Sequence, residues 1–233
     1  MLKAHLTAIG RAHDRALAGL RHLDGVASLL IRLILGPVLI ASGWEKLTGT
    51  NWFVHVLDSF PFPFNVLPAE FSWFLASWTE FLGGILLLFG LATRVVAIPL
   101  AVTMFVAAWS VHLDNGWAAI APSRPAAVCI PGSEAHAASS RFVRFMECQN
   151  VNARTIEASK RLARAKAILR EHGDYRYLNG RGAIVKLNNG IEFAAIYLTM
   201  LLGLLIIGGG RYFSLDYYVR LFVERSVTKG AGG

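Results

Sequence analysis

The sequence contains few charged residues. Only 16% of its 233 residues are Asp, Glu, Lys or Arg, whereas soluble domains average about a quarter. Hydrophobic residues make up 55% of the chain. This balance excludes an ordinary soluble domain and predicts an integral membrane protein with the lipid bilayer as its first partner. The net charge of +8 fits anionic lipid and the positive-inside rule better than nucleic acid, which we do not expect as a partner.

The sequence also lacks the motifs that hold common cofactors. It has no nucleotide-binding loop, flavin fingerprint, nucleophile elbow or cluster of metal ligands, so we expect no metal site. It has only two cysteines, Cys129 and Cys148, which are not spaced as a CxxC pair or as metal ligands. In an oxidising compartment this pair favours a structural disulfide. Two free thiols and a redox-active pair are the alternatives.

Four apolar stretches are about as long as a bilayer requires, since about 20 residues cross ~30 Å of hydrocarbon. Residues 25–114 contain the first three, and residues 189–213 contain the fourth. The predicted fold is an all-α integral membrane protein, a four-transmembrane-helix bundle with a helical insertion outside the cytoplasm. The spans are expected over 25–47, 70–92, 95–114 and 189–210.

Basic residues in the short segments predict the orientation of the spans. Residues 1–24 are polar and basic, without the apolar core of a cleavable signal peptide, and residues 214–233 are basic as well. Both are therefore predicted to be cytoplasmic, which places residues 115–188 outside. That insertion is also basic, but long loops translocate largely regardless of their charge.

The insertion 115–188 is predicted to contain an amphipathic helix over 153–172. Asn152 can cap its start, Gly173 ends it, and alanines and leucines share one face. The helix allows two interpretations: a basic helix that lies on the membrane surface or on the bundle, or a docking surface for an acidic partner. Its basic residues are Lys160, Arg161, Arg164, Lys166 and Arg170.

Ionisable residues and tryptophans gather at the outer ends of the predicted spans. In the stretch "WTEFLGGILLLFGL", Glu80 lies about ten residues into the second span, or ~15 Å from its outer end. An ionised carboxylate at the centre of a membrane helix costs ~2.5 kcal/mol or more. We therefore expect Glu80 to face a packed interior or a wet cavity, with Lys46 or His112 as its partner.

This outer end allows two interpretations. Glu80 is either a buried clasp that fixes the register of the helices, or part of a tryptophan-walled pocket in which carboxylates and a histidine move protons. The candidate catalytic residues are Glu80, His112 and Glu192. The candidate pocket residues are Trp44, Glu45, Lys46, Trp73, Ser77, Trp78, Trp109 and Asp114.

Three stretches resemble the DoxX family of small bacterial and archaeal four-helix membrane proteins: residues 32–49, 80–109 and 190–216. The first contains Gly-x-x-Lys-Leu, and the second contains Glu-x-x-Gly-Gly followed by Thr-Arg. The fourth span partly echoes the second, which suggests a duplicated helix pair. The resemblance covers the spans and leaves out the insertion 115–188.

The resemblance implies an inner-membrane subunit of an oxidoreductase complex, with the insertion in the periplasm. Some members look like subunits of quinone-linked sulfur-oxidising enzymes, such as thiosulfate:quinone oxidoreductase. The implied partners are a quinone or another lipophile, together with a redox protein or further copies of the chain. The resemblance carries over no catalytic residues, so whether the chain is an enzyme is left open. The alternatives are a non-catalytic structural or assembly subunit, and a small proton-coupled transporter or lipophile-binding protein that uses Glu80 and Glu192.

Overall fold

The computed structural model describes residues 10–11, 14, 19 and 23–230, so most of the predicted cytoplasmic segment 1–24 lies outside the described residues. The described chain is helical, with one isolated antiparallel bridge between Ile120 and Leu187. It divides into two compact units. The first comprises Met1–Leu57, Val66–Met104 and Tyr197–Gly233, and the second comprises Asp58–Asn65 and Phe105–Ile196.

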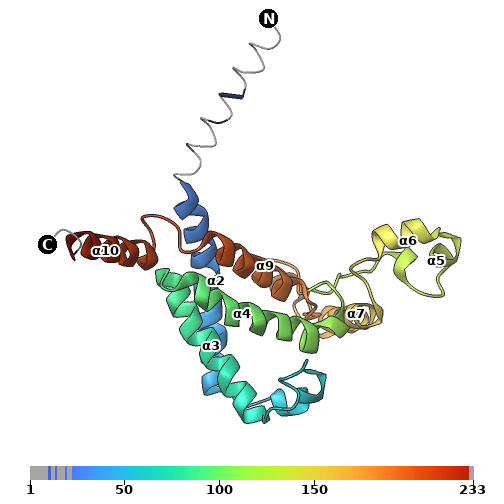
Figure 1. Cartoon of the computed structure of the whole chain (residues 1–233). Helices are drawn as coiled ribbons and strands as arrows, with labels where there is room; N and C mark the ends of the chain where they lie inside the picture. Colours follow the sequence, from blue (N-terminus) through green and yellow to red (C-terminus); the bar gives the residue numbers. More distant parts are fainter. Residues whose placement is uncertain (1–9, 12–13, 15–18, 20–22, 231–233) are drawn as a thin grey trace, which may run out of the picture. The chain divides into compact units, whose positions relative to one another are not determined.

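The first unit is built from four apolar helices (Figure 1). They are α2 (Asp24–Thr48), α3 (Ala69–Phe89), most of α4 (Thr93–Ala107) and most of α9 (Glu192–Ile207). All four contribute to one buried apolar core, as expected for a helix bundle. The core consists of Leu35, Leu39, Leu87, Val96, Ala97, Leu100, Met104, Leu201 and Leu204.

Three helical segments are long and apolar enough to cross a membrane: Gly25–Thr48, Ala69–Phe89 and Thr93–Asn115. The third continues α4 through the π-helix η4 (Ala108–His112) and the 3-10 helix η5 (Leu113–Asn115). These segments agree with the first three predicted spans, so the chain is a multi-pass membrane protein. Helix α9 is apolar but has only 16 residues, about 24 Å at 1.5 Å per residue.

Glycines bring the backbones of α2 and α3 close together. A Cβ atom on Gly84 would lie 2.8 Å from the amide nitrogen of Ile40, and one on Gly43 would collide with the backbone of Phe81. Real Cβ atoms do not approach other atoms as closely as either of these would. The missing Cβ atoms therefore let the two helices pack in direct backbone contact, as small residues do in membrane interfaces.

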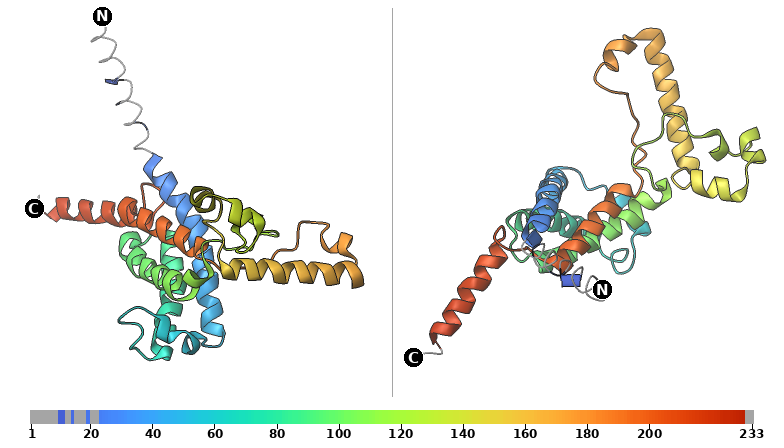
Figure 2. Two further views of the ribbon diagram at one scale, coloured as in Figure 1. Left: turned by 90° about the vertical axis from the view of Figure 1, so that its right-hand side faces the viewer. Right: turned by 90° about the horizontal axis from the view of Figure 1, so that it is seen from above.

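Short helices and one amphipathic helix complete this unit. The segment between α2 and α3 contains the 3-10 helix η2 (Phe53–His55) and, at the boundary of the two units, η3 (Leu57–Ser59). After α9, a glycine-rich turn leads into α10 (Leu215–Gly230). Figures 1 and 2 show α10 projecting away from α2, α3 and α4, with its first turn bonded to the start of α4 through Asp216.

The second unit contains the insertion between α4 and α9. Its elements are η6 (Ala127–Cys129), α5 (Glu134–Ala138), α6 (Arg141–Glu147), α7 (Ala153–His172) and α8 (Tyr175–Leu178). Helix α7, the long helix of the insertion in Figure 2, coincides with the helix predicted over 153–172. Asn152 caps it as expected, because its Oδ1 atom accepts a hydrogen bond from Thr155 N at 2.9 Å.

Candidate functional site

A buried ion pair joins α2 to α3. Nζ of Lys46, in the last turn of α2, lies 2.6 Å from Oε2 of Glu80, in the middle of α3. The side chain of Glu80 is 3% exposed and that of Lys46 is 16% exposed. Lys46 also donates a hydrogen bond to Oγ of Ser42 at 2.7 Å. Of the two partners that the sequence offered for Glu80, the structure therefore supplies Lys46.

The packing around this pair explains how an apolar helix holds a carboxylate. Oγ of Ser77, one turn before Glu80, donates to the backbone carbonyl of Trp73 at 2.6 Å. Its hydroxyl proton is therefore not donated to Glu80, and Lys46 is the donor to that carboxylate. Gly83 and Gly84 follow Glu80 on the buried side of α3. When one member of a buried ion pair is lost, the remaining charge costs ~3–5 kcal/mol. Lys46 and Glu80 therefore depend on each other.

Aromatic rings surround this end of the first unit. Trp44 and Trp78 both pack against Phe81, with ring centroids 5.8 Å and 6.2 Å apart. Their residues are 57% and 38% exposed, which fits an aromatic belt at the membrane surface. Trp73 instead lies in a cluster with Trp52 and Phe53, at 6.1 Å and 5.0 Å. Glu45, next to Lys46 in the sequence, is exposed.

The other predicted site residues lie in the second unit. Two of them form hydrogen bonds that join the first and last residues of the insertion, which we call its base. Nδ1 of His112 lies 2.9 Å from the carbonyl oxygen of Asn189. Oε2 of Glu192 accepts a hydrogen bond from the amide of Ala119 at 2.9 Å. Backbone bonds continue this closure, with Asn188 N donating to Ala119 O and Ala121 N donating to Lys186 O, both at 2.9 Å. His112 and Glu192 thus hold the two ends of the insertion together.

Asp114 forms an exposed ion pair with Arg154, at 3.2 Å between Oδ2 and Nη2. Exposed pairs contribute about 0–1 kcal/mol, so this contact orients Arg154 more than it stabilises the fold. Arg154 also donates to Oδ1 of Asn115 at 3.1 Å. Trp109 is exposed and stacks on Phe105, with ring centroids 6.2 Å apart.

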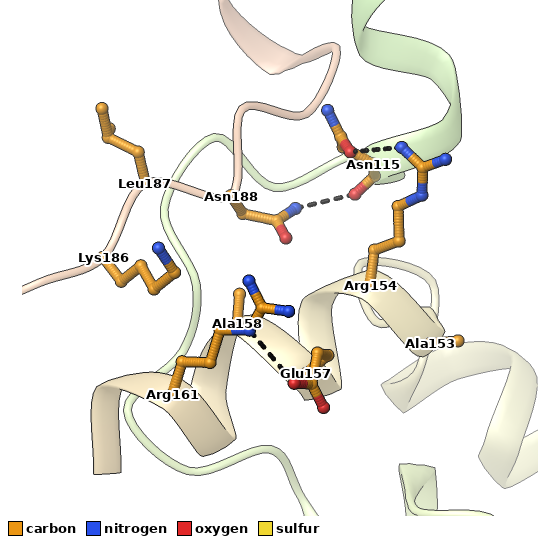
Figure 3. A pocket seen from close by; sticks show the side chains of 9 residues that line it. All are labelled: Asn115, Ala153, Arg154, Glu157, Ala158, Arg161, Lys186, Leu187 and Asn188. Carbon is orange, nitrogen blue, oxygen red and sulfur yellow. Dashed lines mark hydrogen bonds and ion pairs between the residues drawn. The ribbon is translucent and has the colours of Figure 1, made fainter. Parts of the chain in front are cut away.

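Arg154 borders a cavity of about 470 Å³ between the start of α7 and the base of the insertion (Figure 3), and several charged side chains line it. Its cations are Arg154, Arg161 and Lys186, and its one carboxylate, Glu157, is paired with Arg161 at 3.1 Å. Asn188 forms another wall and donates to the carbonyl oxygen of Asn115 at 2.7 Å. The cavity therefore has an excess of positive charge and suits an anionic group.

The sequence indicated the basic face of α7 but not this cavity. Lys186 and Asn188 follow α7 by more than a dozen residues, and only the hydrogen bonds at the base of the insertion bring them beside Arg154 and Glu157. Nothing in the local sequence around Lys186 indicates that pairing.

The two cysteines of the insertion form a disulfide, which joins η6 to the residue after α6. Arg144 reinforces the same region by donating to the carbonyl oxygens of His136 and Ser139, at 2.8 Å and 2.7 Å. Within the described part of the chain, no group of three or more His, Cys, Asp or Glu residues is arranged to hold a metal ion.

Sequence reasoning did not select Arg32 as a site residue, and the structure buries it completely in α2. Its guanidinium donates to the carbonyl oxygens of Phe213, Gly209 and Leu88, at 2.9 Å, 3.2 Å and 3.2 Å. The sequence did indicate that Arg32 has partners, because an arginine inside an apolar run is rare in membrane helices and is almost always paired there.

Comparisons with known proteins each match part of the chain. Residues 27–113 match the model of the family described as DoxX. An uncharacterised protein of Haemophilus influenzae is 42% identical over 94 residues, which are 40% of this chain and 62% of that protein. The Bacillus subtilis protein named "Putative oxidoreductase CatD" is 31% identical over 88 residues, which are 38% of this chain and 61% of that protein. The chain thus spans about three fifths of the length of these curated relatives, and no solved structure matches it.

Proposed function

We propose that the chain, whose residues 27–113 match the DoxX family model, is a DoxX-like membrane subunit of a quinone-linked oxidoreductase complex. A relative whose printed name includes the word oxidoreductase supports this proposal. The observation that carries it is the buried Lys46–Glu80 pair in the membrane-spanning part of the chain. Ionisable groups at such positions are costly, and they commonly mark proton or substrate pathways.

The chemistry of a quinone matches this pair. Reduction of a quinone to a quinol requires two electrons and two protons. In the proposed complex, a soluble partner supplies the electrons, and Glu80 transfers protons from the outer side of the membrane. The ammonium group of Lys46 donates a hydrogen bond to a quinone oxygen and offsets the negative charge that develops there. The exposed rings of Trp44 and Trp78 give a lipophilic ligand an apolar approach from the bilayer.

In this proposal α9 is the fourth span, both termini are cytoplasmic, and the insertion is periplasmic in a bacterial inner membrane. Leu201 and Leu204 of α9 are buried in the same core as the three longer helices, which supports a common membrane location. The short length of α9 requires a thin or locally deformed bilayer, which membranes accommodate at modest cost.

The basic surface of the insertion is the proposed docking surface for the soluble partner. Lys160, Arg161, Arg164 and Arg170 are exposed on α7, and the cationic cavity lies beside its first turns. An acidic partner would be attracted and oriented by this field, and its association rate would fall as the salt concentration rises.

A structural role is the second candidate, because the carboxylate of Glu80 is already engaged within the protein. Lys46 satisfies one carboxylate oxygen at 2.6 Å, and Ser42 holds Lys46 in place. A clasp of this kind would fix the register of α2 against α3 without any chemistry. An assembly subunit would need nothing more.

Purification of the full chain from its native membranes in a mild detergent tests the proposal. We expect an oxidoreductase to co-purify and to reduce an added short-chain quinone. The double variant Arg161→Glu/Arg164→Glu should release that activity, whereas Arg181→Glu, an exposed arginine elsewhere in the insertion, should retain it. A complex with no quinone reductase activity would contradict the proposed function.

A further inference from the structure

A second cationic cavity lies in the first unit, where α4 begins and α9 ends. Its volume is about 450 Å³, and three arginines line it, Arg94, Arg211 and Arg220, together with Asp216 and Tyr217. The turn Gly208–Gly209–Gly210 forms its floor, with φ angles of 79° at Gly208 and 78° at Gly210 that favour glycine. This cavity is separate from the Lys46–Glu80 pair, and its function does not depend on the proposed oxidoreductase role.

The acceptors around this cavity are already used by the protein itself. The carboxylate of Asp216 accepts the amides of Ala92 and Thr93, at 2.6 Å and 2.9 Å, and so caps the start of α4. Carbonyl oxygens of the glycine turn are bound by Ser28, at 2.7 Å to Gly208, and by Arg32, at 3.2 Å to Gly209. These carboxylate and carbonyl oxygens at the cavity therefore already accept hydrogen bonds from donors of the protein itself.

Arg94 and Arg220, by contrast, use only part of their donor capacity within the protein. Arg94 donates through Nη2 to the carbonyl oxygen of Ile206 at 3.0 Å, and Arg220 pairs through Nε with Glu224 at 3.6 Å. Each guanidinium has five N–H donors in a planar fork. The side chains that line the cavity carry three positive charges and one negative charge, and their geometry suits a tetrahedral oxyanion.

We propose that this cavity binds a phosphate group. Two sources share that chemistry: the headgroup of an anionic phospholipid and soluble phosphate. The cavity lies at the ends of membrane helices, and basic pockets at such ends commonly bind lipid headgroups. Buried Arg32 fixes the turn that forms the floor, because it also donates to the carbonyl oxygen of Phe213 at 2.9 Å. The site is therefore formed before the ligand arrives.

Helix α10 favours the lipid as the source. Leu215, Val219, Phe222 and Val223 are exposed and share one face at helical spacing. Figures 1 and 2 show the helix projecting away from α2, α3 and α4 beyond its first turn. A helix with an exposed apolar face and basic residues on the other side lies in the membrane interface. That position would place Arg220 at the depth of the lipid phosphates.

The test uses the full-length purified chain and measures its thermal unfolding and its lipid binding by native mass spectrometry. Phosphatidylglycerol should raise the unfolding temperature of the wild type more than phosphatidylcholine does. The Arg211→Gln/Arg220→Gln double variant should bind phosphatidylglycerol about tenfold or more weakly. Arg225→Gln removes one charge from the same helix outside the cavity, and its binding should stay within about twofold of the wild type.

Two further measurements separate the sources and guard against misfolding. Inorganic phosphate that protects the chain as well as phosphatidylglycerol does, and competes with it, would assign the site to soluble phosphate; no such effect would assign it to lipid. Arg220→Lys keeps the charge but loses the fork, so it should fold normally and bind with intermediate strength. Equal binding of phosphatidylglycerol by the wild type, the double variant and Arg225→Gln would overturn the proposal.

Discussion

Lys46 and Glu80 are 34 residues apart in the sequence, yet their charged atoms lie 2.6 Å from each other between α2 and α3. This contact explains why an apolar helix contains a carboxylate. The pair neutralises itself where water is scarce, and Ser42 provides Lys46 with one further acceptor. Any function of the Glu80 carboxylate therefore also involves the ammonium group of Lys46.

Substitution of one partner should destabilise the chain more than substitution of both. Lys46→Met should lower the free energy of unfolding by about 3–5 kcal/mol, because it leaves the Glu80 carboxylate buried and unpaired. Lys46→Met/Glu80→Leu should recover most of that loss. Denaturant unfolding in detergent, followed by circular dichroism, measures both variants. A double variant as unstable as the single one would contradict the coupling.

Close packing of α2 against α3 predicts a position-specific effect of glycine substitution. Gly43→Ala should destabilise the bundle by about 1–3 kcal/mol, because its methyl group would collide with the backbone of Phe81. Gly203→Ala is the control, since no atom lies within 4 Å of that added methyl group. Thermal unfolding of both variants checks this. Equal effects would show that the helices do not depend on this contact.

The disulfide should stabilise the insertion locally. It closes a loop with a sequence separation of 19 residues, for which chain entropy gives ~3 kcal/mol. Cys129→Ser/Cys148→Ser should therefore become sensitive to protease between α5 and α6, while the membrane helices stay intact. Non-reducing mass spectrometry of the wild type should find no alkylated thiol. Two alkylated cysteines without reductant would contradict the disulfide.

Orientation in the membrane is tested by reporter fusions. Alkaline phosphatase inserted near Gly132 should be active in the periplasm. Gly132 suits the insertion because no other atom lies within 4 Å of a Cβ atom added there. A fluorescent protein fused to the C-terminus should fluoresce in the cytoplasm. The reverse pattern would place the insertion in the cytoplasm and remove the proposed periplasmic partner.

Local signals predicted the features that depend on neighbouring residues. The cap at Asn152, the extent of α7 and the position of Glu80 inside an apolar helix could all be read from short stretches of sequence. Lys46 was one of two partners that the sequence offered, because it and Glu80 fall in the same half of their predicted spans.

Features that depend on distant pairing were not predictable in the same way. His112 and Glu192 reach their partners across 77 and 73 residues, so the sequence indicated their chemistry but not their place at the base of the insertion. The fourth helix is shorter than the predicted span 189–210. Asn189 and Gly190 bond to the start of the insertion instead, and the positive φ at Gly208 ends the helix.

The central claim is that the Lys46–Glu80 pair moves protons for a quinone, and the most direct test is quinone-coupled turnover in membranes. Glu80→Gln/Lys46→Gln removes both charges, leaves neither group unpaired and keeps hydrogen-bonding capacity, so the chain should fold and assemble. We expect turnover to fall by about 100-fold, as when a general acid or base is lost, while Glu70→Gln, an exposed carboxylate on the same helix, keeps wild-type turnover. Wild-type turnover in the well-expressed Lys46–Glu80 variant would contradict the claim and leave the pair as a structural clasp.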